Sequence, residues 1–237
     1  MAIARLGETI AFPDPESAHP SGAVAFGGDL SVERLLVAYS MGIFPWPSSP
    51  RQIWWHAPAE RFVVPPSQVR INRTLRKVLA KHPFRISLDT CFQRVMEACA
   101  ATPRPGQDGT WILPEMVSSY TQLHHMGLAH SVEAWQGDEL VGGLYGVALG
   151  RGFNGESMFS HADNASKVAF VTLAEQLRRW GFYFIDAQVH TPLLESLGGT
   201  AIPRRSFTQL VQAAVAQPGV PGPWRLDPDL ERGYAVL

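Results

Sequence analysis

Three polar side chains from two distant segments could line one wall of a cleft. Glu156 lies in a segment rich in aromatic residues, and Asp186 and Gln188 lie in another, both with the composition of β-strands. Because alternate residues of a strand share a face, we expect Asp186 and Gln188 to point the same way. Carboxyl and amide groups there can hold a polar substrate and exchange protons with it. A structural hydrogen-bond acceptor at a strand end is the alternative for Asp186.

The segment between them would bring these side chains together. Residues 164–180 carry apolar side chains at helical spacing, and Gly181 follows where a helix would end. With strands expected over 153–160 and 183–188, the order strand, helix, strand predicts a crossover within one sheet. Burying carboxylates on such strands is costly, which indicates that they face a ligand.

The composition is that of a folded globular protein. Hydrophobic residues make up 46% and charged residues 17% of the 237 residues, and the net charge of −1 favours no class of partner. Cys91 and Cys99 fall in one expected helix, which favours free thiols over a disulfide or a metal site. The first ten residues do not have the pattern of a signal peptide, and no apolar run reaches membrane-spanning length. We therefore expect a cytoplasmic protein with no membrane contact.

A local run of positive charge stands out on this nearly neutral chain. Residues 66–88 contain no acidic residue, and a helix is expected over 71–81. Its basic side chains would gather on one side. They are Arg73, Arg76, Lys77 and Lys81. Such a surface suits a polyanion, but an ordinary solvated face explains the charges equally well.

The first 62 residues are expected to form a small α/β lobe, with a larger domain over 63–237. A helix begins near Ser31, and Gly42 ends it. The Pro-dense stretch 45–66 is expected to form the junction between the two parts. Its rings, including Trp46, either fill the joint between the lobes or face a ligand.

The order of elements in the larger domain indicates its fold. The expected elements are helices over 91–100 and 114–126, strands over 129–135, 139–148 and 153–160, the crossover helix, a further strand and a C-terminal helix. This order resembles the GCN5-type N-acyltransferase fold. We therefore predict an α+β protein whose mixed sheet is flanked by helices. The turn 160–167 has no glycine where that fold cradles pyrophosphate, which argues against coenzyme A.

Short motifs along most of the chain carry a closer likeness. The matching stretches are 26–31 (FGGDLS), 39–46 (YSMGIFPW), 54–55 (WW), 109–112 (GTWI), 130–133 (HSVE), 140–147 (LVGGLYGV), 155–160 (GESMFS), 164–167 (NASK), 186–188 (DAQ), 196–198 (SLG) and 202–205 (IPRR). In this order they are highly specific, and the sequence resembles the leucyl/phenylalanyl-tRNA–protein transferase family. Leu144 departs from the Met expected at its position.

The resemblance implies an activity. The family moves Leu or Phe from aminoacyl-tRNA to the α-amine of proteins that begin with Arg or Lys, and so marks them for N-end-rule degradation. The reaction is aminolysis of an ester that is already activated, so it needs no metal, no ATP and no cofactor. The remaining tasks are positioning, proton removal and stabilisation of an oxyanion.

The resemblance also assigns site residues. Gln188 would accept a hydrogen bond from the acceptor amine, and Asp186 would polarise and orient Gln188. Glu156 would either contact an ammonium group of a substrate or attract the cationic first residue of the acceptor protein. Side chains expected to bind the donor amino acid are Phe153, Met158, Phe170, Leu173, Leu177 and Ile185.

The resemblance also implies which residues contact the tRNA. Trp46 and Trp111 would surround the terminal adenosine, and the basic helix would contact the tRNA backbone. Two rival interpretations remain, which are a coenzyme-A-dependent N-acetyltransferase and a non-catalytic tRNA- or peptide-binding module. Turnover with aminoacyl-tRNA separates both rivals from the transferase.

Overall fold

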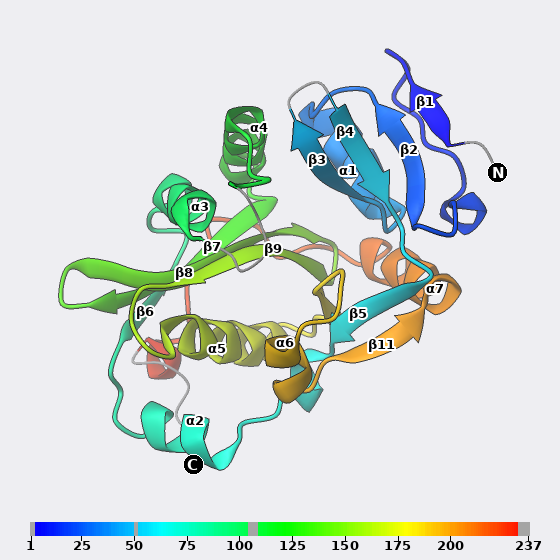
Figure 1. Cartoon of the computed structure of the whole chain (residues 1–237). Helices are drawn as coiled ribbons and strands as arrows, with labels where there is room; N and C mark the ends of the chain where they lie inside the picture. Colours follow the sequence, from blue (N-terminus) through cyan, green and yellow to red (C-terminus); the bar gives the residue numbers. More distant parts are fainter. Residues whose placement is uncertain (1–2, 50–51, 104–108, 232–237) are drawn as a thin grey trace.

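Two mixed β-sheets form the framework of the computed structural model, which describes residues 3–49, 52–103 and 109–231 (Figure 1). The smaller sheet has the order β1-β2-β4-β3, with β1 parallel to β2 and the other pairs antiparallel. Its strands are β1 (Ala4–Leu6), β2 (Ala23–Gly27), β3 (Phe44–Ser49) and β4 (Gln52–His56). Helix α1 (Val32–Ser40) begins at Ser31, whose hydroxyl caps it, as expected from the sequence.

The larger sheet has the strand order β11-β5-β10-β9-β8-β7-β6. Strand β10 is parallel to β9, and the other neighbouring pairs are antiparallel. The strands are β5 (Glu60–Val64), β6 (Arg85–Leu88), β7 (Ala129–Gln136), β8 (Glu139–Leu149), β9 (Gly152–Ser160), β10 (Phe184–Asp186) and β11 (Thr200–Pro203). Helix α5 (Ala165–Arg179) joins β9 to β10, so the predicted crossover is confirmed.

Helices cover both faces of the larger sheet (Figure 1). One face carries α5 and α2 (Arg73–Leu79), which share a core with it. The other face carries α3 (Phe92–Ala101) and α4 (Pro114–His125), and α1 joins this second core. The remaining helical elements are α6 (Pro192–Ser196), α7 (Arg204–Val215) and the 3-10 turns Pro15–Ser17, Pro66–Gln68 and Pro228–Leu230. In the part of the chain that the structure describes, no helix is long and apolar enough to cross a membrane.

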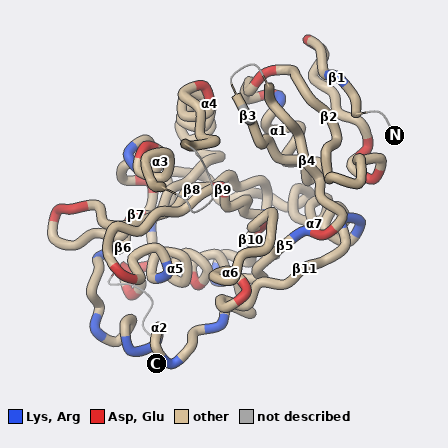
Figure 2. Tube along the Cα trace, in the orientation of Figure 1, with Lys and Arg blue, Asp and Glu red and all other residues tan. Residues whose placement is uncertain are grey.

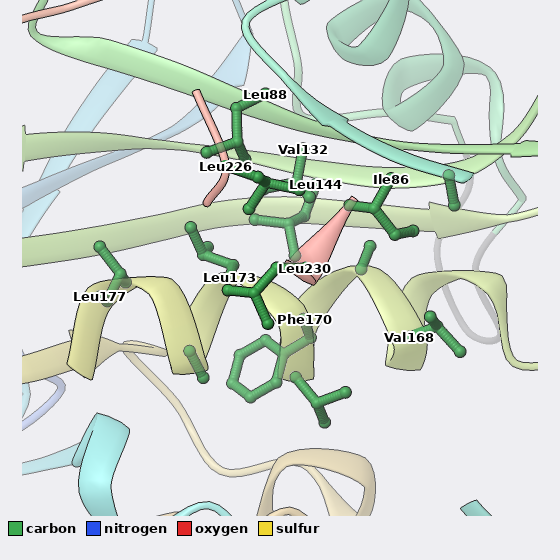
Figure 3. Packing of buried hydrophobic residues seen from close by; sticks show 14 of the residues in the cluster. Ile86, Leu88, Val132, Leu144, Val168, Phe170, Leu173, Leu177, Leu226 and Leu230 are labelled. Carbon is green, nitrogen blue, oxygen red and sulfur yellow. The ribbon is translucent and has the colours of Figure 1, made fainter. Parts of the chain in front are cut away.

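Helix α5 holds the crossover in place by burying nearly its whole length. Leu173 and Leu177 are fully buried, and Leu144 and Val132 of the sheet face the helix (Figure 3). Each fully buried side chain of this size contributes about 1.5–3 kcal/mol. Phe170 lies on the side of the helix away from these strands (Figure 3). This packing fixes β9 and β10, which carry the polar side chains of interest.

A β-bulge in β9 places Glu156. Gly155 pairs with Gly146 of β8, while Ser157 pairs with the residue just before Gly146, so Glu156 is the extra residue. A Cβ atom on Gly146 would lie 2.2 Å from the carbonyl oxygen of Asn154, so this position requires glycine. Bulges of this kind redirect a side chain, and they are frequent beside active sites.

The bulge also shifts the alternation of side chains along β9. Phe153 pairs with Ala148, and Met158 pairs with Leu144. These two partners are four positions apart on β8, so they lie on the same face of that strand. Paired residues share a face, so Phe153 and Met158 both face α5 although they are five positions apart in the sequence. A regular strand would have placed them on opposite faces.

Two predicted elements are shorter in the structure. Strand β10 ends at Asp186, and Gln188 follows in a left-handed turn with a φ angle of +56°. The prediction that Asp186 and Gln188 share one face of a strand is therefore wrong. The basic helix begins only at Arg73, after a cap by the side chain of Asn72.

The α+β class is confirmed by the two mixed sheets and their helices. The GCN5-type topology and the division of the chain at residue 62 stay predictions. Strand β5, which contains that boundary, belongs to the larger sheet.

Candidate active site

An apolar cavity of about 480 Å³ lies where β9 and β10 separate. The two strands pair as far as Asn154 and Asp186, after which β10 ends and β9 continues. Side chains from both cores, such as Leu144 and Tyr145, line the cavity. The cavity therefore lies beside the part of β9 that continues past the end of β10.

The structure brings all but one of the predicted substrate-binding residues to this cavity. The lining includes Trp46, Trp111, Phe153, Met158, Phe170, Leu173 and Ile185. Leu177 does not line it, because this side chain is fully buried in the core one turn further along α5. Leu173 and Leu177 share a side of the helix, so helical spacing alone could not separate them. The sequence did not reveal Phe44, Leu193 and Leu194, which also line the cavity.

Two indole rings lie at the solvent-facing rim. Trp46 is 38% exposed, and Trp111 is partly exposed. Trp46 packs against the rings of Phe44 and His56, with centroids 6.0 and 6.1 Å away. Since β3 carries Trp46, the smaller sheet contributes part of the cavity wall. A supported, partly exposed ring can stack on a flat ligand.

Asp186 forms an ion pair that the sequence did not reveal. Arg61 of β5 donates from Nε to Oδ1 at 2.8 Å and from Nη2 to Oδ2 at 2.6 Å. Both side chains are buried, with at most 1% exposed. A bidentate pair of this geometry is among the stronger polar contacts in proteins. It offsets the cost of burying the carboxylate.

Asp186 holds Gln188 through the main chain. Its Oδ1 accepts the Gln188 N–H at 2.9 Å, which stabilises the left-handed turn. Strand β5 fixes the same turn, because Ala187 donates its N–H to the Phe62 carbonyl at 2.9 Å and Phe62 donates its N–H to the Gln188 carbonyl at 3.2 Å. The orientation of Gln188 thus depends on its backbone, which is restrained by the Asp186 side chain and, independently, by the main chain of Phe62.

The side-chain amide of Gln188 is directed at Glu156. Its Nε2 donates to Oε1 of Glu156 at 3.5 Å, and the Tyr120 hydroxyl donates to Oε2 at 3.3 Å. Burial raises the pKa of Glu156 to about 8, and the charge of Asp186 adds to the effect. Glu156 lines the cavity, so a group that exchanges protons near neutral pH faces the ligand space.

Two buried phenols support Glu156 from behind. The hydroxyl of Tyr39 on α1 is hydrogen-bonded to that of Tyr120 on α4. Both side chains are at most 1% exposed, and burial raises the pKa of each well above its ordinary value. The phenols therefore stay neutral near pH 7. Three elements far apart in the sequence, α1, α4 and β9, meet at the Glu156 carboxyl group.

The start of α5 differs from a phosphate cradle. The Ser166 N–H donates to Oγ of Ser160 at 3.2 Å, so part of the first turn already has an internal acceptor. A Cβ on Gly142 would lie 2.5 Å from that of Ala165, so β8 packs tightly against this end. The absence of a coenzyme A site stays a prediction from the sequence.

The four basic side chains expected to contact RNA lie on the surface. Arg73, Arg76, Lys77 and Lys81 are exposed, with Lys81 just beyond the end of α2. Lys and Arg residues gather in and around α2 (Figure 2). Leu75 and Leu79 bury the opposite side of this helix. Helix α2 contacts α5, whose residues line the cavity.

The site can bind an apolar side chain beside a group that accepts a proton. Gln188 offers a carbonyl oxygen, and Glu156 offers a carboxyl group whose pKa is close to that of an α-amine. Among the described residues, no three His, Cys, Asp or Glu side chains are placed to hold a metal ion. These features suit a reaction in which an amine nucleophile loses a proton next to an apolar cavity.

Known proteins match nearly all of the chain. The family model described as leucyl/phenylalanyl-tRNA protein transferase matches residues 63–212, and that of its N-terminal domain matches residues 28–59. A leucyl/phenylalanyl-tRNA–protein transferase of Myxococcus xanthus (strain DK1622) is 52% identical over 90% of this chain and 91% of its own length. One from Anaeromyxobacter sp. (strain Fw109-5) is 48% identical over 96% and 97%, respectively. The chain is therefore an aminoacyltransferase that belongs to the leucyl/phenylalanyl-tRNA–protein transferase family.

Proposed function

We propose that this enzyme transfers Leu or Phe from aminoacyl-tRNA to the α-amine of proteins that begin with Arg or Lys. The observation that carries the proposal is the junction of an apolar cavity with Glu156 and Gln188 at one wall. The product would be a substrate for N-end-rule degradation. Both substrates are cytoplasmic, and we expect the enzyme to act there.

The donor amino acid would enter the apolar part of the cavity. Phe153 and Met158 face it from β9, and Phe170 faces it from α5. A flexible Met side chain can adapt to branched Leu and to flat Phe. The terminal adenosine would stack on Trp46 or Trp111 at the rim, where a base on an aromatic ring is worth ~1–3 kcal/mol. The ester carbon would then lie near the polar wall.

The acceptor amine would approach Gln188 and Glu156. The Gln188 carbonyl oxygen would accept a hydrogen bond from the amine, because its amide nitrogen is turned toward Glu156. Glu156, with a pKa of about 8, is mostly protonated near pH 7, and its ionised form would be the one that acts as the base. That form would take a proton from the attacking amine at little cost in free energy, since an α-amine has a similar pKa. Direct attack forms the amide bond, breaks the ester bond and releases the tRNA with a free terminal ribose hydroxyl, so the proton lost by the amine is balanced by the one gained by that oxygen. The step needs no metal, no ATP and no covalent intermediate.

The tRNA body would lie against the basic surface formed by Arg73, Arg76, Lys77 and Lys81. Each of these side chains is exposed, and phosphate contacts of this kind give affinity without sequence specificity. Because α2 contacts α5, the basic surface adjoins the helix that lines the cavity.

We further propose a GCN5-type N-acyltransferase fold for residues 63–237, with residues 1–62 as a separate small lobe. The position of the cavity beside the end of the β9–β10 pairing supports the fold, since enzymes of that type bind the acyl carrier where neighbouring strands splay apart. The separate smaller sheet supports the lobe.

A transfer assay tests the function. The protein is incubated with Leu-tRNA labelled on Leu and with matched peptides that begin with Arg, Lys or Asp. We expect labelled peptide with Arg and Lys, little with Asp, and none when the α-amine of the Arg peptide is acetylated. Acetyl-coenzyme A in place of the charged tRNA should give no acetylated peptide. Transfer to the acetylated peptide would contradict the proposal, because no free α-amine would then be required.

A further inference from the structure

We propose that Arg61 is a positioning residue of the transfer reaction, which places Gln188 and tunes Glu156 through Asp186. The inference rests on the proposed function, in which Gln188 and Glu156 act on the acceptor amine. Arg61 is 1% exposed and does not line the cavity, so its influence reaches the substrates only through its neighbours.

The guanidinium group is held in one orientation. Nε and Nη2 of Arg61 both donate hydrogen bonds to the Asp186 carboxylate. The Arg61 Cζ lies 4.4 Å from the ring centroid of Phe44 and 4.6 Å from that of Phe207. The first ring comes from β3 of the smaller sheet, and the second comes from α7. A planar fork stacked on flat rings fixes a direction that a lysine ammonium group cannot reproduce. The Asp186 carboxylate is therefore fixed as well.

This orientation is transmitted to the reacting groups. Asp186 Oδ1, held by Arg61, accepts the Gln188 N–H, and Phe62 next to Arg61 makes the backbone contacts to the same turn. One short piece of β5 thus restrains Gln188 through a side chain and through the main chain. The Phe44 contact also links this piece to the smaller sheet, which supplies Trp46 to the rim.

The charges of Asp186 and Arg61 also affect the pKa of Glu156. The charge of Asp186 raises the pKa of Glu156, and the charge of Arg61 lowers it. Without Arg61, a buried carboxylate would remain without its partner, and Asp186 would either move or take up a proton. Each outcome alters the turn at Gln188 and the proton affinity of Glu156 together.

The substitution Arg61→Lys keeps the charge and removes the fork. Its matched control is Arg34→Lys, because Arg34 is also fully buried and pairs with an aspartate, Asp29, but lies outside the site. Both variants are compared with wild type in single-turnover transfer from preloaded Leu-tRNA to an Arg-starting peptide. The rate constant and the amplitude are measured, together with the affinity for an aminoacyl-adenosine mimic.

For Arg61→Lys we expect a rate constant about 10- to 100-fold lower, with amplitude and mimic affinity near those of wild type, because small misplacement of reacting groups is costly. A purely structural role would lower the amplitude, through a smaller folded fraction, and leave the rate constant unchanged. Arg34→Lys should behave in that structural way. A wild-type rate constant in Arg61→Lys, or an equal loss of mimic affinity, would overturn the inference.

A second comparison keeps the inference testable if Arg61→Lys does not fold. The double variant Arg61→Met/Asp186→Asn removes both charges and should have a rate constant within about twofold of Asp186→Asn, since residues that act as a unit are not additive. A further large loss would refute the link through Asp186. Gln188→Ala separates the two hypotheses. The proposed function fails if the wild type forms no labelled peptide. If the wild type transfers Leu but Gln188→Ala retains the full rate, the role of Gln188 fails and the inference with it, whereas a slow Gln188→Ala beside a fast Arg61→Lys defeats the inference alone.

Discussion

Asp186 accepts the main-chain N–H of Gln188 at 2.9 Å while both of its carboxylate oxygens also bind Arg61. The side chain of Gln188 instead interacts with Glu156, because its Nε2 donates to Oε1 of Glu156 at 3.5 Å. Two neighbouring residues thus have separate tasks: Asp186 shapes the backbone, and Gln188 presents an amide to the cavity. The carboxyl group that lines the cavity with a raised pKa is Glu156, which belongs to another strand, and in the proposed reaction it exchanges the proton.

Loss of either Asp186 or Gln188 should slow the chemical step. Asp186→Asn weakens the ion pair with Arg61 and the hydrogen bond that stabilises the turn at Gln188. Gln188→Ala removes the side-chain amide itself. We expect each to lower the single-turnover rate by about 10- to 100-fold, and the double variant to be little worse than the worse single one. Thermal unfolding and binding of an aminoacyl-adenosine mimic serve as controls. Full rates in both single variants would rule out this assignment.

Glu156→Gln should stabilise the fold, and more so at higher pH. The folded chain keeps the Glu156 proton up to about pH 8, whereas the unfolded chain loses it near the ordinary pKa of 4.5. The wild type therefore loses stability as the pH rises from about 4.5 to about 8, and the loss persists above that range. Glutamine does not titrate, so it avoids this loss.

Urea unfolding at pH 5 and at pH 8.5 measures this effect. We expect the advantage of Glu156→Gln to grow between them by on the order of 2 kcal/mol, less than the full pKa shift implies because Glu156 is partly exposed. Glu97→Gln on the exposed side of α3 is the matched control and should show no such growth. A constant difference between Glu156→Gln and wild type would mean that Glu156 is ionised at neutral pH.

The cavity should select the donor by apolar fit. Met158→Ala enlarges the cavity and should lower transfer of Leu and Phe together, about tenfold, with donors such as Asp or Lys remaining poor. Leu177→Val in the adjoining core is the control, because Leu177 is buried but does not line the cavity. It should cost about 1 kcal/mol of stability and leave the donor KM unchanged. Efficient transfer of Asp would contradict an apolar pocket.

The basic surface should bind tRNA through its phosphates. Replacing Arg73, Arg76, Lys77 and Lys81 by Gln should weaken tRNA binding and flatten its dependence on salt, because fewer counterions are released. Affinity for the short aminoacyl-adenosine mimic should change little. The single variants Arg76→Gln and Arg5→Gln each remove one exposed positive charge, the first from the basic surface and the second from the distant strand β1. Arg5→Gln is the control and should bind tRNA like wild type. If the mimic loses as much affinity as whole tRNA, the surface is structural.

The sequence predicted elements best where packing is periodic and local. Helix α5 was found because its apolar residues recur at helical spacing, and the β7–β8 hairpin because a short polar turn joins two strand-like runs. Strand β5 was missed because its side chains from Arg61 to Val64 are all buried, which leaves no alternation to detect. Short edge strands such as β6 and β11 leave too few residues for any period.

The sequence indicates most of the predicted residues that meet at the cavity, but not their geometry. Motifs indicated Glu156 and Gln188, yet the bulge that places one and the left-handed turn that places the other depend on partners in neighbouring strands. Arg61 was missed because its ion pair joins residues 125 positions apart, and no local pattern records such a contact. Tyr39 and Tyr120 were not predicted as members of the site, although their hydroxyl groups support Glu156.

A rapid-quench time course tests direct transfer at this site most closely. Leu-tRNA labelled on Leu is preloaded on excess enzyme and mixed with an Arg-starting peptide, and the label on tRNA, protein and peptide is followed after denaturation. We predict that label leaves the tRNA and appears on the peptide with one rate constant, with none bound covalently to the protein. Label that accumulates on the protein before it reaches the peptide would contradict direct attack by the amine.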